Sequence, residues 1–209
     1  MEIRKPIVRK ENLKKVVPVP APILDLDDAE AADALFDGVT FEEVKINGSV
    51  VNNFSVQSSE IEEVKITDSF LTNCNFAGAT VNQTYFERIV VTKCRFQGTA
   101  LMECFLRDVM FEKLKCAEVA LRFSKLKQVV FTDCDLEDAD FVGAVLEDVV
   151  FKNCNLRSAQ FSQSKLKNVN FKDSVIEGIA IEKDSFGTIT VNSGQALYLA
   201  STLGLNIED

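Results

Sequence analysis

The chain has 209 residues, of which 46% are hydrophobic, and a formal net charge of −9 at pH 7. This length allows one large domain or two small ones, and the apolar content can form a buried core. The sequence lacks histidine, the commonest acid–base group and metal ligand, and the negative charge argues against general binding to nucleic acid. It shows neither a membrane span nor the apolar core of a signal peptide, which predicts a soluble cytoplasmic protein.

Residues 1–33 predict a basic arm followed by a cap. Residues 1–15 carry six Lys or Arg and two Glu, so the arm is read as a solvated tail, the alternative being a ligand for an acidic partner. Residues 16–24 read VVPVPAPIL, and their three prolines predict extended chain. Residues 25–36 have helical composition and an acidic first turn, so we expect a short helix there. We expect residues 16–36 to cover the open end of the repeats that follow.

A period of five residues runs through residues 34–193. Every fifth residue from Phe36 to Val191 is apolar, at all 32 positions, and 12 of these are Phe. A second column lies two residues earlier, from Ala34 to Ile189, and 29 of its 32 members are small or β-branched. A compact turn with one large and one small inward side chain explains this pattern, whereas a strand would alternate and a helix would repeat every 3.6 residues.

A second period of twenty residues lies over the first. The block VVFTDCDL at 129–136 returns as VVFKNCNL at 149–156. Four units of five residues therefore complete one coil, and eight coils at strand spacing would be about 38 Å long. Between Phe131 and Phe171 the large column alternates Phe and Leu, which places Phe on two opposite sides of each coil. The sequence thus predicts an all-β fold of stacked four-sided coils.

These residues resemble the pentapeptide repeat family, whose motif is A(D/N)LXX. The best matches are CDLEDADF at 134–141 and CNLRSAQF at 154–161, and the resemblance covers residues 34–193. It implies a right-handed quadrilateral β-helix, a solenoid of about eight coils. The Ala of the motif is often Val or Cys here, and its Asn or Asp is often another residue, but both inward positions keep their size. The predicted domains are therefore 1–33 (arm and cap), 34–193 (β-helix) and 194–209 (C-terminal capping helix).

Six cysteines lie in the inward columns. Cys74, Cys94, Cys104, Cys134 and Cys154 occupy the small column and Cys116 the large one. Their spacing does not match a metal site, so they are read as buried free thiols. Stacked neighbours would have Cα atoms about 4.8 Å apart, which permits a disulfide, but a cytoplasmic protein favours the reduced form.

The C-terminal segment from Asn192 leaves the period of five and predicts a helix. Asn192 or Ser193 can cap its start and Gly204 can end it. The apolar face of this helix either covers the last coil or also forms a homodimer interface. The resemblance supports the second reading, because in the quinolone-resistance branch of the family a C-terminal helical segment joins two chains. The candidate dimer residues are Leu197, Leu199 and Leu203.

Two sides of the predicted β-helix carry asymmetric outward residues. The side of Phe41 and Ile61 has eight acids and only two bases, and its first two coils are the most acidic, through Glu42, Glu43, Glu60, Glu62 and Glu63. On the side of Val51 the outward residue is apolar in six successive coils: Val50, Phe70, Val90, Met110, Val130 and Val150. Such a stripe is too large to remain in water, so we expect residues 16–24 or a second chain to cover it. Both surfaces are candidate partner sites, although a solvated acidic face and strand propensity also explain them.

The function must then lie in binding, since the sequence shows no catalytic set, no phosphate loop and no metal or cofactor cluster. Relatives in the quinolone-resistance branch are acidic DNA mimics that bind DNA gyrase, and this chain resembles their loop-free members in length, acidity and coil count. Duplex DNA, however, carries about 22 charges over ~38 Å, more than the −9 of this chain. The alternative is a structural or interaction scaffold with an unrelated protein partner.

Overall fold

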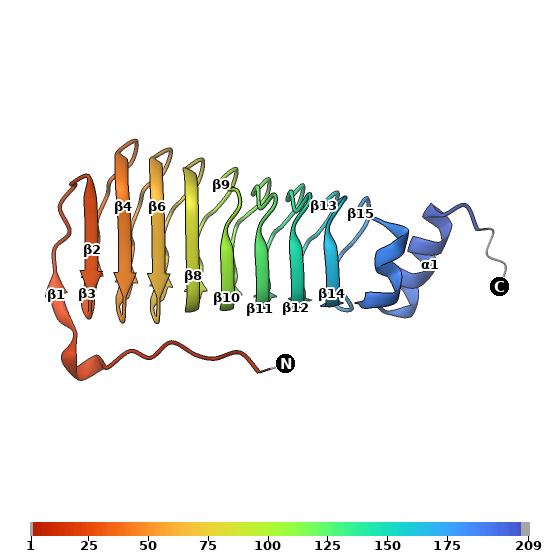
Figure 1. Ribbon diagram of the computed structural model, residues 1–209, viewed down its shortest axis with the longest axis horizontal. Coiled ribbons are helices and arrows are strands. Elements are labelled where there is room, and N and C mark those ends of the chain that lie inside the picture. The colour runs from red at the N-terminus through yellow and green to blue at the C-terminus, as the bar shows by residue number, and fades with distance from the viewer. Residues whose placement is uncertain (1, 206–209) are drawn as a thin grey trace.

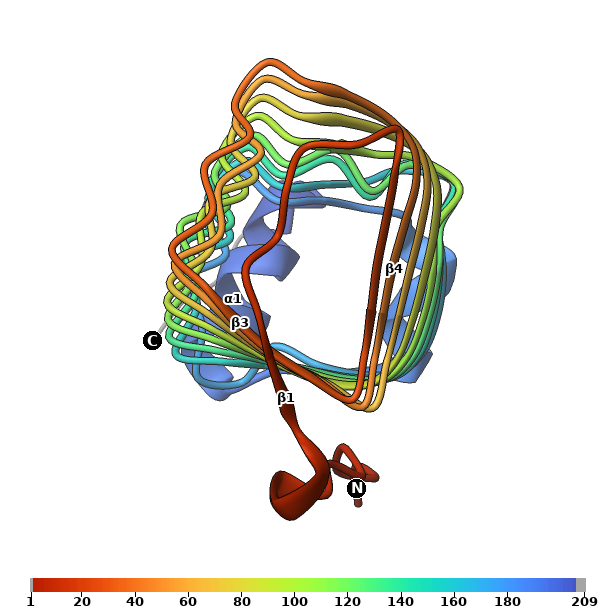
Figure 2. The ribbon, with the colours of Figure 1, turned by 90° about the vertical axis from the view of Figure 1, so that its left-hand side faces the viewer.

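The computed structural model describes residues 2–205. Parallel strands stack into a β-solenoid of about eight turns, and a short helix follows at its C-terminal end (Figure 1). Viewed along its axis the solenoid has four sides (Figure 2). The fold predicted from the two periods is therefore confirmed.

The strands fall into long and short groups. The long strands are β4 (Thr40–Asn47), β6 (Glu60–Thr67), β8 (Thr80–Thr92), β10 (Phe105–Glu112), β11 (Lys125–Thr132), β12 (Val145–Lys152) and β14 (Lys165–Asn170). The short strands are β1 (Lys14–Val16), β2 (Ile23–Asp27), β3 (Ala29–Ala32), β5 (Val50–Asn52), β7 (Phe70–Thr72), β9 (Ala100–Leu101), β13 (Gln160–Phe161), β15 (Ala180–Ile181) and β16 (Ile189–Thr190). The remaining elements are the 3₁₀ helices η1 (Lys10–Asn12) and η2 (Lys183–Thr188) and the α-helix α1 (Ser193–Thr202).

Neighbouring coils are in register at an offset of twenty residues. Phe111 pairs with Phe131 between β10 and β11, and Phe131 pairs with Phe151 between β11 and β12. Left-handed backbone recurs at the corners, for example at Asn73, Lys93 and Asp133, which turns the chain after each short extended side. The twenty-residue echo in the sequence is thus the stacking distance of the fold.

The core is the large column of the period of five. All but four of its residues from Phe36 to Val191 are buried, and those four, Phe76, Ile181, Phe186 and Val191, are half-buried. Phe131 and Phe151 stack with ring centroids 5.1 Å apart, and Phe141 and Phe161 stack on the opposite side at 4.7 Å. Phe141 and Phe151 meet edge to face at 6.0 Å. Such aromatic contacts stabilise a core beyond the burial of area alone.

The N-terminal end differs from the prediction. Residues 25–36 do not form a helix, because β2 pairs with β4 and β3 pairs with β5 at the usual offset of twenty residues. The regular coils therefore begin near Ile23, before the predicted boundary at residue 34. The Ala and Asp composition of this stretch favours helix only locally, and the pairing of a whole sheet edge outweighs that preference.

Residues 14–22 cover the open end and overlap the start of the predicted cap, residues 16–36. Lys14 pairs with Ala29, an offset of fifteen rather than twenty residues, so this first turn lacks one side. Figure 2 shows the consequence, because the chain after β1 follows a shorter path than the coils behind it. Pro18 is buried there.

The C-terminal end is also modified. In the last coil the 3₁₀ helix η2 replaces an extended side, whereas the period predicted an unbroken coil to residue 193. Asp184, an exception in the small column, lies in η2 and is exposed. Asn192 caps α1 as predicted, through a capping box with Gln195. Residues 206–209 of the predicted helical segment lie outside the described residues. Within residues 2–205 no helix is long and apolar enough to cross a membrane.

Candidate protein-binding surfaces

The acidic side lies on the first long strands, β4 and β6. Glu42, Glu60, Glu62 and Glu63 are exposed there, and Glu43 is half-buried. Register places Glu43 beside Glu63 in the next coil. Nζ of Lys45 lies 2.6 Å from Glu43 and offsets part of this charge, and the same contact raises the pKa of Lys45. The structure therefore brings together the five acids that the sequence singled out.

The acidity ends one coil later. An open polar hollow of about 370 Å³ lies where β6 meets β8. Its lining includes Glu63, Asn82, Gln83 and Glu103, so amides replace the carboxylates in the coil of β8 and a single Glu follows in the next coil. Strong negative charge is thus confined to the first coils.

The apolar stripe lies on the opposite side of the coils. Its members, Val50, Phe70, Val90, Met110, Val130 and Val150, are all half-buried. Residues 16–24 do not run along it, contrary to one of the two expectations. The N-terminal arm, residues 2–13, does so instead. In Figure 1 it leaves η1 and runs back along the outside of the solenoid, parallel to the axis.

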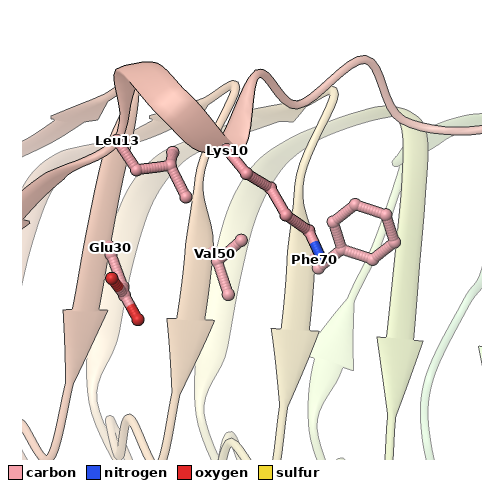
Figure 3. Close-up of a pocket in the computed structure, with 5 residues that line it drawn as sticks. All are labelled: Lys10, Leu13, Glu30, Val50 and Phe70. Carbon is pink, nitrogen blue, oxygen red and sulfur yellow. The ribbon is translucent and has the colours of Figure 1, made fainter.

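The arm lies over the first rungs of the stripe. Lys10 and Leu13 line an open space of about 340 Å³ with Glu30, Val50 and Phe70. In Figure 3, Leu13 points toward the strands of Glu30 and Val50, and the Lys10 chain extends toward the Phe70 ring. Ile3, Pro6 and Val8 are half-buried, whereas Lys5, Ile7 and Arg9 are exposed. The arm is therefore a docked segment and not the solvated tail predicted.

A cluster of charges holds the far end of the arm. The guanidinium of Arg4 contacts Asp108, with Nε 2.8 Å from Oδ2, and the Arg4 backbone N–H lies 3.2 Å from Oδ1. The Asp108 side chain is 0% exposed. Arg4 also lies 3.8 Å from Glu87, and the Ile7 backbone N–H donates to Asp68 at 3.1 Å. Carboxylates at one corner of the coils thus bind both the backbone and the side chains of the arm.

Glu87 is the centre of this cluster. It accepts from the Tyr85 hydroxyl at 2.7 Å and pairs with Arg88 at 2.6 Å and with Arg107. Burial alone would raise the pKa of Glu87, but the hydrogen bonds from Tyr85 and Arg107 outweigh burial and hold that pKa below its ordinary value. The carboxylate therefore stays charged and fixes the neighbouring arginines.

The sequence analysis did not identify Arg4, Glu87 or Asp108. A usable signal existed, because residues twenty apart stack and carry opposite charges in two pairs, Asp68 with Arg88 and Glu87 with Arg107. The contact of Arg4 with Asp108 crosses 104 positions, and no periodicity indicates it.

The C-terminal helix covers the last coil. Leu199 is 6% exposed and belongs to the core, so its assignment to a dimer surface is wrong. Leu197 and Leu203 are 53% and 38% exposed. An open apolar space of about 240 Å³ lies beside α1, and Phe186, Ile189, Leu199, Leu203 and Leu205 are among its lining residues.

The six cysteines are free and buried, as predicted. Burial raises the pKa of the Cys104 thiol to about 12, so this group stays protonated at neutral pH. The Cys74 backbone N–H lies 3.2 Å from the Cys94 sulfur in the next coil. Within residues 2–205 no group of three or more Cys, Asp or Glu side chains forms a metal site.

Comparison with known proteins agrees with the fold. The chain belongs to the pentapeptide repeat family, because the family model described as "Pentapeptide repeat region" matches residues 64–141 and 115–181, more than half of the chain. Proteins of this family are typically structural or interaction proteins. No curated protein sequence matches the chain significantly.

Several solved structures are similar at low identity. HetL, involved in heterocyst differentiation regulation in the cyanobacterium Nostoc sp., is 12% identical, with 76% of this chain and 85% of HetL covered and a TM-score of 0.33. QnrB1, a plasmid-mediated fluoroquinolone resistance protein, is 16% identical, with 85% and 99% covered and a TM-score of 0.33. A pentapeptide repeat protein from the Arabidopsis thaliana thylakoid lumen is 19% identical, with 61% and 71% covered and a TM-score of 0.30.

Proposed function

We propose that this protein is a non-catalytic binding protein whose acidic side contacts a basic surface of a protein partner. The observation that carries the proposal is the group of Glu42, Glu60, Glu62 and Glu63 on the adjacent strands β4 and β6, where four exposed carboxylates lie on one side of the solenoid. Clustered like charges cost stability in the isolated chain, and a cationic partner relieves that cost and is steered toward the site.

The first partner to test is DNA gyrase or another topoisomerase, whose DNA-binding surface is basic. In this narrower form of the proposal the acidic side acts as a DNA mimic and occupies the place of a duplex, as in quinolone-resistance proteins of the family. We place this interaction in the cytoplasm, in agreement with six free thiols. The proposal needs neither a cofactor nor direct contact of this chain with nucleic acid.

The test is inhibition of gyrase supercoiling by the purified chain, with charge reversal on the acidic side. The variant E42K/E60K/E62K should lose inhibition by about tenfold or more, since each lost ion pair at an interface weakens binding. The control E118K/E137K/E177K makes the same change in net charge at exposed acids elsewhere and should inhibit like the wild type. An equal loss of inhibition in both variants would mean that only the net charge matters. Absence of inhibition by the wild type would reject gyrase as the partner.

A second candidate is a scaffold for a smaller, unrelated basic protein. The confinement of the acids to two coils favours it, because two coils span only about 10 Å, whereas a DNA mimic would present charge along its whole length. Capture of a partner from lysate by the wild type but not by E42K/E60K/E62K, with no effect on supercoiling, would select this function.

We also propose a homodimer through the C-terminal end, where Leu197 on α1 and Leu203 directly after it are exposed and Leu203 lines an apolar space. L197K should then convert a dimer to a monomer in light scattering, because a buried charge opposes association. L35K at the other end of the chain, where Leu35 is 76% exposed, is the matched control. A monomeric wild type would reject the dimer.

A further inference from the structure

The N-terminal arm, residues 2–13, binds to a surface of the coils in the same chain. We propose that the strip formed by Asp68, Glu87 and Asp108 and by the stripe residues Phe70, Val90 and Met110 is a binding site for an extended, arginine-containing peptide segment. In the isolated chain the arm itself occupies this strip, so a partner segment must displace it. The strip lies opposite the acidic side, and the inference does not rest on the proposed function.

The first argument is the pairing of Asp108. Within residues 2–205, Arg4 donates every hydrogen bond that the Asp108 carboxylate accepts. The donors are the Arg4 backbone N–H, Nε and Nη2. With the arm in place the Asp108 side chain is 0% exposed, so Arg4 supplies the donors that a carboxylate shielded from water needs. Glu87 differs, because Tyr85, Arg88 and Arg107 bind it without the arm. Asp108 is therefore the carboxylate of the strip whose pairing comes from the arm alone.

The second argument is the way in which the arm is attached. Its residues 2–13 make no backbone–backbone hydrogen bond to a coil, whereas β1, which follows, pairs with β3. The arm is held by the two corner carboxylates and by half-buried side chains such as Ile3, Val8 and Leu13. It also leaves an open space above Val50 and Phe70 (Figure 3). Release of the arm therefore breaks no sheet ladder, and its hinge stays fixed at β1.

The third argument is complementarity. The arm is basic, with four Lys or Arg against two Glu in residues 2–13, and the corner that it follows offers carboxylates at Asp68, Glu87 and Asp108. Ile3 and Val8 are half-buried, and Leu13 lies beside Val50 and Phe70. A guanidinium matches a carboxylate with two parallel hydrogen bonds, which a lysine cannot do. The partner segment is thus defined as an extended basic peptide with an arginine between aliphatic side chains.

The test uses the full-length chain and a fluorescent peptide of residues 2–13. The arm in cis has an effective concentration in the millimolar range, so the wild type should bind the peptide poorly. R4E places a carboxylate beside Asp108, frees the strip and should strengthen peptide binding by about tenfold or more. K5E, which makes the same charge change at an exposed neighbour, should behave like the wild type. A peptide with R4A should bind the R4E chain about tenfold more weakly than the native peptide.

Two results would overturn the proposal: equal binding of the peptide to wild type and R4E, or equal binding of the native and R4A peptides to the R4E chain. Tryptic cleavage after Arg9 and Lys10 gives a second readout, which should accelerate severalfold in R4E and not in K5E. Unchanged cleavage in R4E would show that Arg4 does not hold the arm. A wild-type dimer that R4E converts to a monomer would assign the strip to the arm of a second copy and would also overturn the intramolecular assignment.

Discussion

The side that carries the acids has two halves with different backbones. In the first coils β4 and β6 run straight through Glu43 and Glu63, without a left-handed residue. In later coils Glu103, Phe123, Gly143 and Gln163 occupy the equivalent position with positive φ, and the chain turns there. Figure 2 shows the result, since the early coils reach further out on the upper side of the view than the later ones.

The residues that follow this corner differ in the same way. The inward residues of the straight half are Val44, Val64 and Thr84, whereas those of the turned half are Cys104, Ser124, Ala144 and Ser164. Branched side chains favour extended backbone, and smaller ones fit beside a turn. At other corners, however, branched residues do follow left-handed ones, namely Ile89, Val109, Val119, Val129, Val149, Val169 and Ile179. Branching alone therefore does not decide where the chain turns. One repeat thus builds two surfaces, an acidic flat one and a turned one with exposed Met102, Phe123 and Val145.

The largest expected effect tests the core of the turned half, where the aromatic stacks run. F151A should lower the free energy of unfolding by about 3–5 kcal/mol, because the Phe151 ring is fully buried between Phe131 and Phe171. K152A at the exposed neighbouring position should change it by less than about 0.5 kcal/mol. Urea unfolding followed by circular dichroism measures both, and similar losses would show that the inward register is wrong.

A smaller effect concerns the thiol of Cys104, which follows the first turned corner. Its pKa of about 12 in the folded chain exceeds the ordinary value near 8.5. The stability from the protonated thiol is therefore complete below the unfolded pKa and is lost as the pH rises toward 12. Between pH 8 and pH 10 the wild type should lose about 2 kcal/mol more than C104A in urea unfolding. Parallel pH profiles for the two chains would contradict the burial of this thiol.

The smallest effect tests the corner itself. A Cβ added to Gly143 would lie 2.5 Å from the Phe123 ring, whereas one added to Gly98 meets nothing within 4 Å, although both glycines have positive φ. G98A should cost about 1–2 kcal/mol from backbone conformation alone, and G143A about 1 kcal/mol more. Thermal or urea unfolding in an F123A background should remove that difference. A difference that persists would mean that Phe123 does not fill the space over Gly143.

The sequence predicted the repeating part of the fold well, for a physical reason. A large apolar residue at each fifth position predicts a buried side chain there. The large column from Phe36 to Ile176 is buried as predicted, except that Phe76 is half-buried. The stretch at 25–36 was misread, because helical composition is a local signal and pairing with β4 and β5 is not. The five clustered acids were also predictable, since stacking follows from the offset of twenty.

The arm could not be predicted, because its position depends on a few contacts between distant residues. Arg4 meets Asp108 across five coils of chain that carry no sign of the contact. The burial of Leu199 and the exposure of Leu197 could not be predicted for a similar reason. Both are leucines on one short helix, and only the packing of α1 on the last coil decides that the first is buried and the second exposed.

The incomplete first turn has a consequence for assembly. A stack of parallel strands is open-ended, and its last backbone edge can template the addition of another chain and so grow into a fibre. Here the terminal strand β1 is only three residues long, and the stretch after it carries Pro18, Pro20 and Pro22. Proline has no N–H to donate to a further strand. The missing side and the three prolines together end the ladder at this edge, and they oppose the addition of a further strand to the N-terminal end of the solenoid.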